Sequence, residues 1–123
     1  MKDEIYRILK NCWCIQTSSL WTIDNPAKGQ CGVTSLIIND YFDGTILKTF
    51  TVKGWHFYNY INGKRYDFTK SQFAHEIPYS DFASTRDEAF SDTNQDQYNI
   101  LKKRFEDKLK YLKIKEENIK DLL

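Results

Sequence analysis

The sequence has almost no net charge and no long apolar run. Its 18 basic and 17 acidic residues give a formal net charge of +1, so no overall field attracts a nucleic acid or an anionic membrane surface. No apolar stretch approaches the roughly 20 residues that span a bilayer, and the N-terminal segment lacks the apolar core of a signal peptide. We therefore expect a cytoplasmic protein with neither a nucleic-acid nor a membrane partner.

Cysteine is also scarce. Cys12 and Cys14 are too close in sequence for an ordinary bridge and leave Cys31 alone, which excludes a disulfide framework. With His56 and His75, the thiols offer a zinc or redox site as a minor alternative. The Cys-Trp-Cys spacing, however, differs from the ligand spacing of zinc ribbons. We expect no metal and no cofactor.

Aromatic residues, by contrast, make up 15% of the 123 residues. They supply enough core material for one domain over residues 1–123. Apolar residues recur at helical spacing over 3–13 and again from Cys31 onward. Asp43 and Gly44 predict the end of the second helix, because glycine readily adopts the left-handed conformation that follows a helix.

The middle of the chain predicts strands and its C-terminal part predicts helices. β-Branched and aromatic residues indicate three strands, over 45–54, 55–61 and 64–69. Thr69 and Thr85 each have the spacing of a capping box and predict short helices. A last helix is predicted from an apolar stripe, Tyr98, Leu101, Phe105, Leu109 and Leu112. This order predicts an α+β fold, with N-terminal helices on a small, mainly antiparallel sheet and helices at the C-terminus.

The dipeptide Asn62-Gly63 predicts a two-residue hairpin turn, because a type I′ turn needs positive φ at both central residues. Pairing the strands outward from this turn puts His56 and Asp67 on one face of the sheet. They become diagonal neighbours, roughly 7 Å apart at the backbone. A carboxylate and an imidazole at that separation can lean together, so the turn predicts a hydrogen-bonded His–Asp pair.

The stretch NPAKGQCGVTSL places Cys31 where a polar loop becomes a helix. The helix dipole and the unpaired N–H groups of the first turn favour a thiolate. We therefore expect the pKa of Cys31 to lie below that of the other two cysteines. A helix packed across the sheet face that carries His56 would bring nucleophile, base and the orienting Asp67 together.

The residues around Cys31 suggest how a substrate is held. Gly29 and Gly32 would leave room for a carbonyl group near the sulfur. The backbone N–H of Cys31 is one candidate oxyanion donor, and the side chain of either Gln30 or Asn25 can supply a second.

Two aromatic residues on the His56 strand complete the candidate site. Tyr58 shares the His56 face and is expected to line a pocket, with sheet packing as the alternative. Trp55 is a candidate substrate contact, with a place in the core or at its rim as the alternative. Cys31 can equally be a buried structural cysteine. His56 can be a strand histidine that Asp67 holds for stability.

At these residues the sequence resembles the papain-like superfamily, especially its transglutaminase-like branch. GQCGV at 29–33 is similar to the segment around the transglutaminase nucleophile, and WHFYNYINGKRYDFT at 55–69 resembles the His-strand, turn and Asp-strand unit. The resemblance implies a papain-like fold with Cys31, His56 and Asp67 as a catalytic triad. The sequence departs from the pattern at Asn25, where the papain branch has glutamine, and at Gly32, where an aromatic residue is common.

Over most of its length the sequence resembles the YunG-like family of small bacterial proteins. The segments NPAKGQCGVTSL, FDGTILKT, HFYNYINGKRYDFTKSQF and TRDEAF carry this resemblance. It specifies a family and not a substrate.

The residues and the superfamily resemblance predict a cysteine-dependent hydrolase or acyltransferase. Its substrate would be an amide or peptide-like bond in a peptide, a protein or a small amide. The alternative is a non-catalytic binding or interaction module on a degenerate papain-like scaffold, which the small size of the chain favours. The apolar end IKDLL is expected to dock either on the body of the same chain or on a second copy of it. In the second case the protein would form a homo-oligomer.

Overall fold

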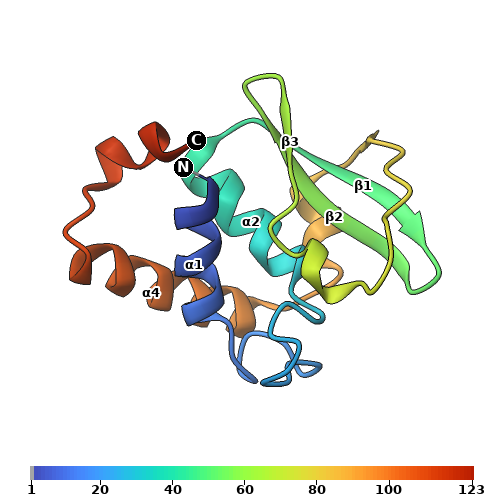
Figure 1. The fold of residues 1–123 in the computed structure, drawn as a ribbon, viewed down its shortest axis with the longest axis horizontal. Coiled ribbons are helices and arrows are strands. Elements are labelled where there is room, and N and C mark those ends of the chain that lie inside the picture. The colour runs from blue at the N-terminus through green and yellow to red at the C-terminus, as the bar shows by residue number, and fades with distance from the viewer. Residues whose placement is uncertain (1) are drawn as a thin grey trace.

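In the computed structural model, which describes residues 2–123, helix α2 lies between the sheet and the other long helices (Figure 1). The helices are α1 (Lys2–Cys12), α2 (Cys31–Phe42), α3 (Arg86–Phe90) and α4 (Gln95–Tyr111), with 3₁₀ helices at Lys70–Gln72 and Glu116–Leu122. The strands are β1 (Thr45–Thr51), β2 (Gly54–Ile61), β3 (Lys64–Tyr66) and β4 (Phe82–Ala83). The predicted α+β class is confirmed.

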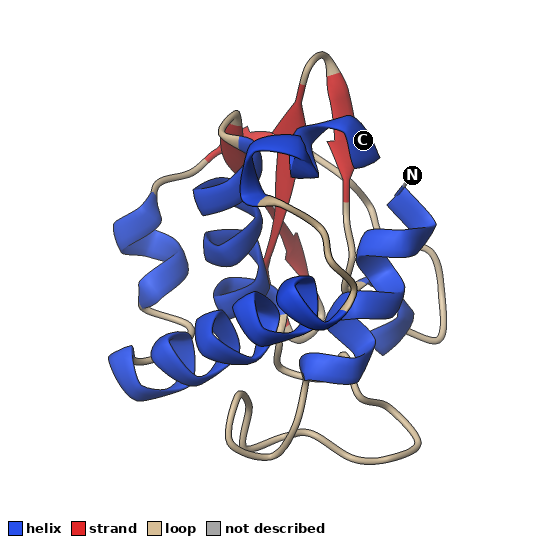
Figure 2. Cartoon of the chain, turned by 90° about the vertical axis from the view of Figure 1, so that its left-hand side faces the viewer, coloured by secondary structure: helices blue, strands red, loops and turns tan. Residues whose placement is uncertain are grey.

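Helix α2 is buried on nearly all sides. Its apolar residues Val33, Leu36, Ile37 and Ile38 are inaccessible to solvent, as expected of a helix that is apolar all round. It packs against β2, α3 and α4, and the long helices gather on one side of the sheet (Figure 2). Within residues 2–123, no helix combines the length and hydropathy needed to cross a membrane.

The sheet is antiparallel, with strand order β3-β2-β1-β4. The predicted hairpin register is confirmed: Ile61 pairs with Lys64, and Asn62 and Gly63 both have positive φ. Strand β3 ends at Tyr66, before the predicted 69. The Asp67 carboxylate accepts a hydrogen bond from the Thr69 backbone N–H, and this local turn competes with further strand pairing.

The two faces of β2 pack against different parts of the chain. The side chains of Phe57, Asn59 and Ile61 alternate with those of His56 and Tyr58 and so point to the opposite face. Asn59 donates a hydrogen bond to the Ser35 carbonyl in α2, which identifies the helix face. Helix α2 therefore packs on the face opposite His56, and not across the face that carries it.

The His56 face is covered by the segment of residues 69–81. The rings of His56 and Phe73 meet edge to face with centroids 4.9 Å apart, and those of Tyr58 and Tyr79 meet at 5.0 Å. Thr49, on the same face, donates to the Pro78 carbonyl. This irregular segment therefore takes the place of a second helical layer.

Several short elements differ from the sequence prediction. Thr85 caps α3 as predicted, accepting from the Glu88 N–H. The Thr69 side chain makes no capping bond, and its hydroxyl donates to Asp67. The two-residue strand β4 was not predicted, since exposed residues give it no periodic pattern. At the C-terminus, the buried Ile119 docks on the body of this chain.

The apolar stripe of the last helix provides a stability test. Leu101 in α4 is fully buried, whereas Leu112, the last member of the predicted stripe, follows the end of the helix and is 41% exposed. Leu101→Ala should lower the free energy of unfolding by about 2–5 kcal/mol. Leu112→Ala should change it by less than about 0.5 kcal/mol. Urea unfolding measures both, and equal losses would contradict this packing.

Candidate active site

The centre of the site is a buried pair of His56 and Asp67. His56 Nε2 lies 2.7 Å from Asp67 Oδ2, and the two side chains are only 1% and 3% exposed. His56 comes from β2, and Asp67 follows β3 directly. The predicted contact is confirmed, because the hairpin register places the two residues as diagonal neighbours on one face.

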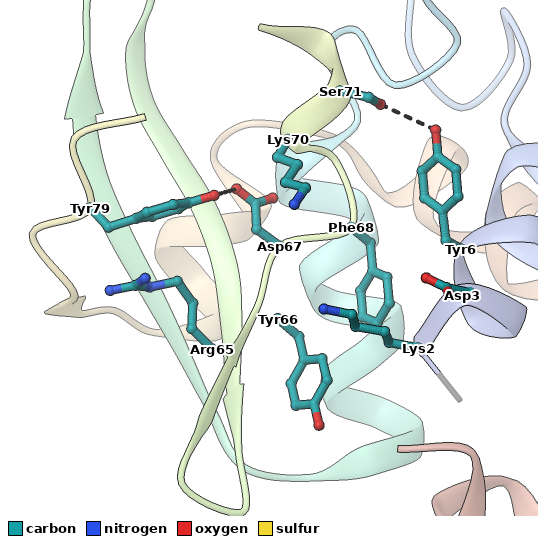
Figure 3. A pocket seen from close by; sticks show the side chains of 10 residues that line it. All are labelled: Lys2, Asp3, Tyr6, Arg65, Tyr66, Asp67, Phe68, Lys70, Ser71 and Tyr79. Carbon is teal, nitrogen blue, oxygen red and sulfur yellow. Dashed lines mark hydrogen bonds between the residues drawn. The ribbon is translucent and has the colours of Figure 1, made fainter. Parts of the chain in front are cut away.

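Asp67 is held by further donors. Tyr79 donates to Oδ2 at 2.8 Å (Figure 3), and Thr69 donates to Oδ1 through its backbone N–H and its hydroxyl. Burial and then the charge of Asp67 raise the pKa of Tyr79, so that the phenol stays protonated and donates. Both carboxylate oxygens are thereby fixed, and with them the imidazole of His56.

The second ring nitrogen of His56 is unpaired. Among residues 2–123, the buried Nδ1 has no hydrogen-bond partner. With the proton on Nε2, where Asp67 accepts it, Nδ1 carries a lone pair and can act as a base. A buried polar atom without a partner is costly and calls for an explanation.

Cys31 is the first residue of α2 and is only 7% exposed. Its thiol donates to Asp92 Oδ2 at 3.3 Å, and the Gly32 backbone N–H donates to the same oxygen at 3.0 Å. No hydrogen bond joins the thiol to the His56 ring in the part of the chain that the structure describes. The partner of the thiol is thus Asp92, which sequence reasoning missed.

The expectation of a lowered pKa for Cys31 is wrong in this structure. Burial, and after it the negative charge of Asp92, raise the pKa of the thiol, outweighing a hydrogen bond from the Phe57 backbone N–H. That contact places the thiol beside the peptide group between His56 and Phe57. Strand β3 pairs with β2 only at residues 59–61, so the thiol reaches the free edge of β2. The start of α2 therefore meets the backbone of β2 next to His56 at this edge.

Asp92 is exposed as a residue, but its carboxyl end is turned inward. Desolvation of the carboxyl group raises the pKa of Asp92. Hydrogen bonds from the Cys31 thiol and the Gly32 N–H, and after them the nearby His56, lower this pKa by a smaller amount. A Cβ on Gly32 would lie 2.7 Å from Asp92 Oδ2 and from the Ala89 carbonyl. The space above Gly32 is therefore filled by Asp92 and is not free for a substrate carbonyl. A glycine directly after the cysteine is the one sequence signal of this close approach.

The structure places Gln30 and Asn25 in different roles. Gln30 is fully buried beside Cys31, and both its amide nitrogen and oxygen lack partners among the described residues. The amide of Asn25 donates to the Gln72 carbonyl and ties the loop to the segment that covers His56. Of the two, Gln30 is the side chain with free hydrogen-bonding capacity next to the thiol.

The two aromatic candidates, Tyr58 and Trp55, lie on different faces of the sheet. Tyr58 lies on the His56 face, with ring centroids 5.9 Å apart, but its hydroxyl is committed to the carboxylate and the backbone N–H of Asp81. Trp55 lies on the other face, 44% exposed, beneath the ammonium of Lys48. Trp55 is therefore not brought to the site.

The minor zinc alternative lacks a ligand cluster. No three His, Cys, Asp or Glu side chains converge to hold a metal ion within residues 2–123. Cys12 is buried in the core, where desolvation raises its pKa to about 11.

Comparison with known proteins points to one family. The sequence profile of the family described as YunG protein matches residues 1–110. The chain is similar to "Uncharacterized protein YunG" of Bacillus subtilis (strain 168), with 50% identity over 103 residues that cover 84% of this chain and 90% of that protein. No solved structure matches the chain.

Thiol alkylation tests the role of Asp92. At neutral pH, iodoacetamide should label the half-buried Cys14 before Cys12 and Cys31. Asp92→Asn removes a negative charge beside the thiol, which lowers the pKa of Cys31 and raises its thiolate fraction. A shift of one pKa unit would speed Cys31 labelling about tenfold.

Peptide mass mapping resolves the three cysteines in this experiment. Asp87→Asn, at an exposed acid of α3, should leave the Cys31 rate unchanged. Fast labelling of Cys31 in the unmodified protein would contradict the buried, protonated thiol.

Asp67→Asn should destabilise the fold. The substitution turns one acceptor oxygen into an amide group that faces hydrogen-bond donors, at a cost of about 2–3 kcal/mol. Asp24→Asn, at an exposed loop acid, is the matched control with little expected effect. Urea denaturation gives both values, and an Asp67→Asn protein as stable as the control would show that the buried network contributes little.

Proposed function

The chain belongs to the YunG family, and we propose that it is a cysteine-dependent hydrolase or acyltransferase acting on an amide or peptide-like bond. The proposal includes a papain-like arrangement of Cys31, His56 and Asp67. The observation that carries it is the different bonding of the two nitrogens of the His56 ring. The buried Asp67 holds Nε2, whereas Nδ1 is unpaired among the described residues. A catalytic base needs this combination of a fixed tautomer and a free lone pair.

The proposed reaction begins with transfer of the Cys31 thiol proton to His56 Nδ1. The thiolate attacks the acyl carbon and forms a C–S bond. The C–N bond then breaks, and the amine leaves with the proton from the imidazolium. Water or a second amine then attacks the thioester and releases Cys31. Throughout, Asp67 orients the ring and stabilises its positive charge.

The oxyanion formed in this reaction needs donors near the sulfur. Cys31 begins α2, so its backbone N–H belongs to the first turn, which has no intrahelical partner. The buried amide of Gln30 is the second candidate donor, since it makes no other hydrogen bond among the described residues. Both groups adjoin the nucleophile in the sequence.

In the proposed mechanism, the contact between Asp92 and the thiol belongs to a closed resting state. Asp92 covers the thiol and keeps it protonated through burial and charge. Asp92 belongs to the exposed link between α3 and α4, so the carboxylate can turn outward without disturbing the core. A substrate that displaces Asp92 would free the thiol for His56.

A non-catalytic binding module is the second candidate function. The burial of Cys31 and its raised pKa favour this alternative, because both make a poor nucleophile. The two functions differ in whether Cys31 ever becomes acylated.

Acylation by p-nitrophenyl acetate separates the two candidates. We expect a thioester on Cys31, found by intact mass and peptide mapping, that forms faster in Asp92→Asn. Cys31→Ser should abolish it, and His56→Ala should slow it by about 10²-fold or more. Asp67→Asn should retain more activity than His56→Ala, because a poorly held neutral imidazole still accepts a proton.

The controls exclude unfolding and unspecific acylation. Cys14→Ser should leave the thioester unchanged. All variants are compared at a temperature where urea unfolding shows them folded, since Asp67→Asn is expected to be less stable. If neither the unmodified protein nor Asp92→Asn is acylated at Cys31, the enzyme proposal fails and the binding module remains.

A further inference from the structure

We propose that a cavity behind Asp67 binds a small aromatic carboxylate. The cavity measures about 360 Å³ and lies between the start of α1, strand β3 and the 3₁₀ helix Lys70–Gln72 (Figure 3). Its walls include Asp67 and Tyr79 but neither Cys31 nor His56. It is therefore separate from the place where the proposed chemistry occurs. A volume of this size falls in the range of small-molecule sites.

The walls of the cavity suit a planar ring. Tyr6, Tyr66, Phe68 and Tyr79 contribute aromatic surface from three different segments. The rings of Tyr66 and Phe68 lie nearly parallel, 12° apart in orientation with centroids at 6.0 Å. Aromatic side chains prefer offset-stacked or edge-to-face contacts with a further ring, and such contacts are available on both sides of this cavity.

The charges on the walls favour a single negative charge on the ligand. The ammonium groups of Lys2 and Lys70 point into the cavity (Figure 3), and neither forms an ion pair within residues 2–123. Arg65 is held by the carboxylate of Asp81. The acids that line the cavity are Asp3 and Asp67. Because Arg65 is already paired with Asp81, Lys2 and Lys70 are the cations of the lining that are left to receive a carboxylate.

The acids do not reverse this preference. Asp67 is buried, and its two oxygens already accept from four donors. Asp3 lies in the first turn of α1, and within residues 2–123 no ion pair joins it to either lysine. The two unpaired lysines are therefore the groups left to bind a carboxylate, and the hydroxyl of Ser71 can add a hydrogen bond.

Binding of a ligand in the cavity should change the environment of the His56 ring. Tyr79 forms part of the wall, and its hydroxyl donates to Asp67 Oδ2, the same oxygen that holds His56 Nε2. A ligand that contacts Tyr79 therefore perturbs the environment of the buried imidazole through two hydrogen bonds. This inference does not require Cys31 to be a nucleophile.

NMR titration of the full chain with benzoate tests the site. We expect saturable shifts at the backbone amides of Tyr66, Phe68 and Lys70. The ring signals of His56 should move as well, while those of the exposed His75 stay in place. Benzamide, the neutral analogue, should bind about tenfold more weakly, because it lacks the charge that the lysines recognise.

Two lysine variants decide between a built site and general charge attraction. Lys70→Gln should weaken benzoate binding about tenfold and leave benzamide binding unchanged. Lys64→Gln, at an exposed lysine of β3 outside the cavity lining, should leave both unchanged. Both residues are exposed, so neither variant threatens the fold.

The outcomes separate this site from the proposed enzyme. Cys31→Ser should bind benzoate as the unmodified protein does, whether or not the acylation experiment succeeds. The absence of saturable shifts, equal affinity for benzoate and benzamide, or equal losses in the two lysine variants would each overturn the proposed site. Binding without a change at His56 would overturn the link to the imidazole.

Discussion

The buried carboxylate of Asp67 is the constraint on which the rest of the site depends. It accepts from His56, Tyr79 and twice from Thr69, and each contact also shapes the chain. The bond to the Thr69 N–H ends β3 early, and the bond to Tyr79 holds the covering segment over the His56 face. A buried carboxylate left without these donors would be strongly destabilising. The hydrogen bonds of Asp67 therefore determine both the local course of the chain and the orientation of the imidazole.

The two acids of the site act in opposite directions. Asp67 orients the imidazole of His56, since it binds Nε2, while Nδ1 is unpaired among the described residues. Asp92 keeps the thiol of Cys31 protonated, since its charge and the burial around the thiol disfavour a thiolate. The two acids also differ in how they are held: Asp67 accepts four hydrogen bonds, whereas Asp92 accepts two and belongs to an exposed link between two helices.

Local signals predicted much of this architecture. The Asn62-Gly63 turn determined the hairpin register, and the register alone brought His56 to Asp67. The apolar periodicity of α1 and α2 and the Thr85 cap were also predicted, because each depends on residues within a few positions. Predictions failed where two local choices competed. Thr69 has the spacing of a cap, yet its hydroxyl bonds Asp67 instead.

The sequence by itself determined the long helices, the hairpin with its register, and the His–Asp pair. These follow from backbone conformation and from the alternation of side chains along a strand. Only the tertiary structure decided that α2 packs on the face opposite His56, that the thiol reaches the free edge of β2, and that Asp92 covers it. Asp92 lies 61 residues from Cys31 in the chain. No local pattern encodes such a contact, because it arises from the packing of α3 against α2 and from the absence of a side chain on Gly32.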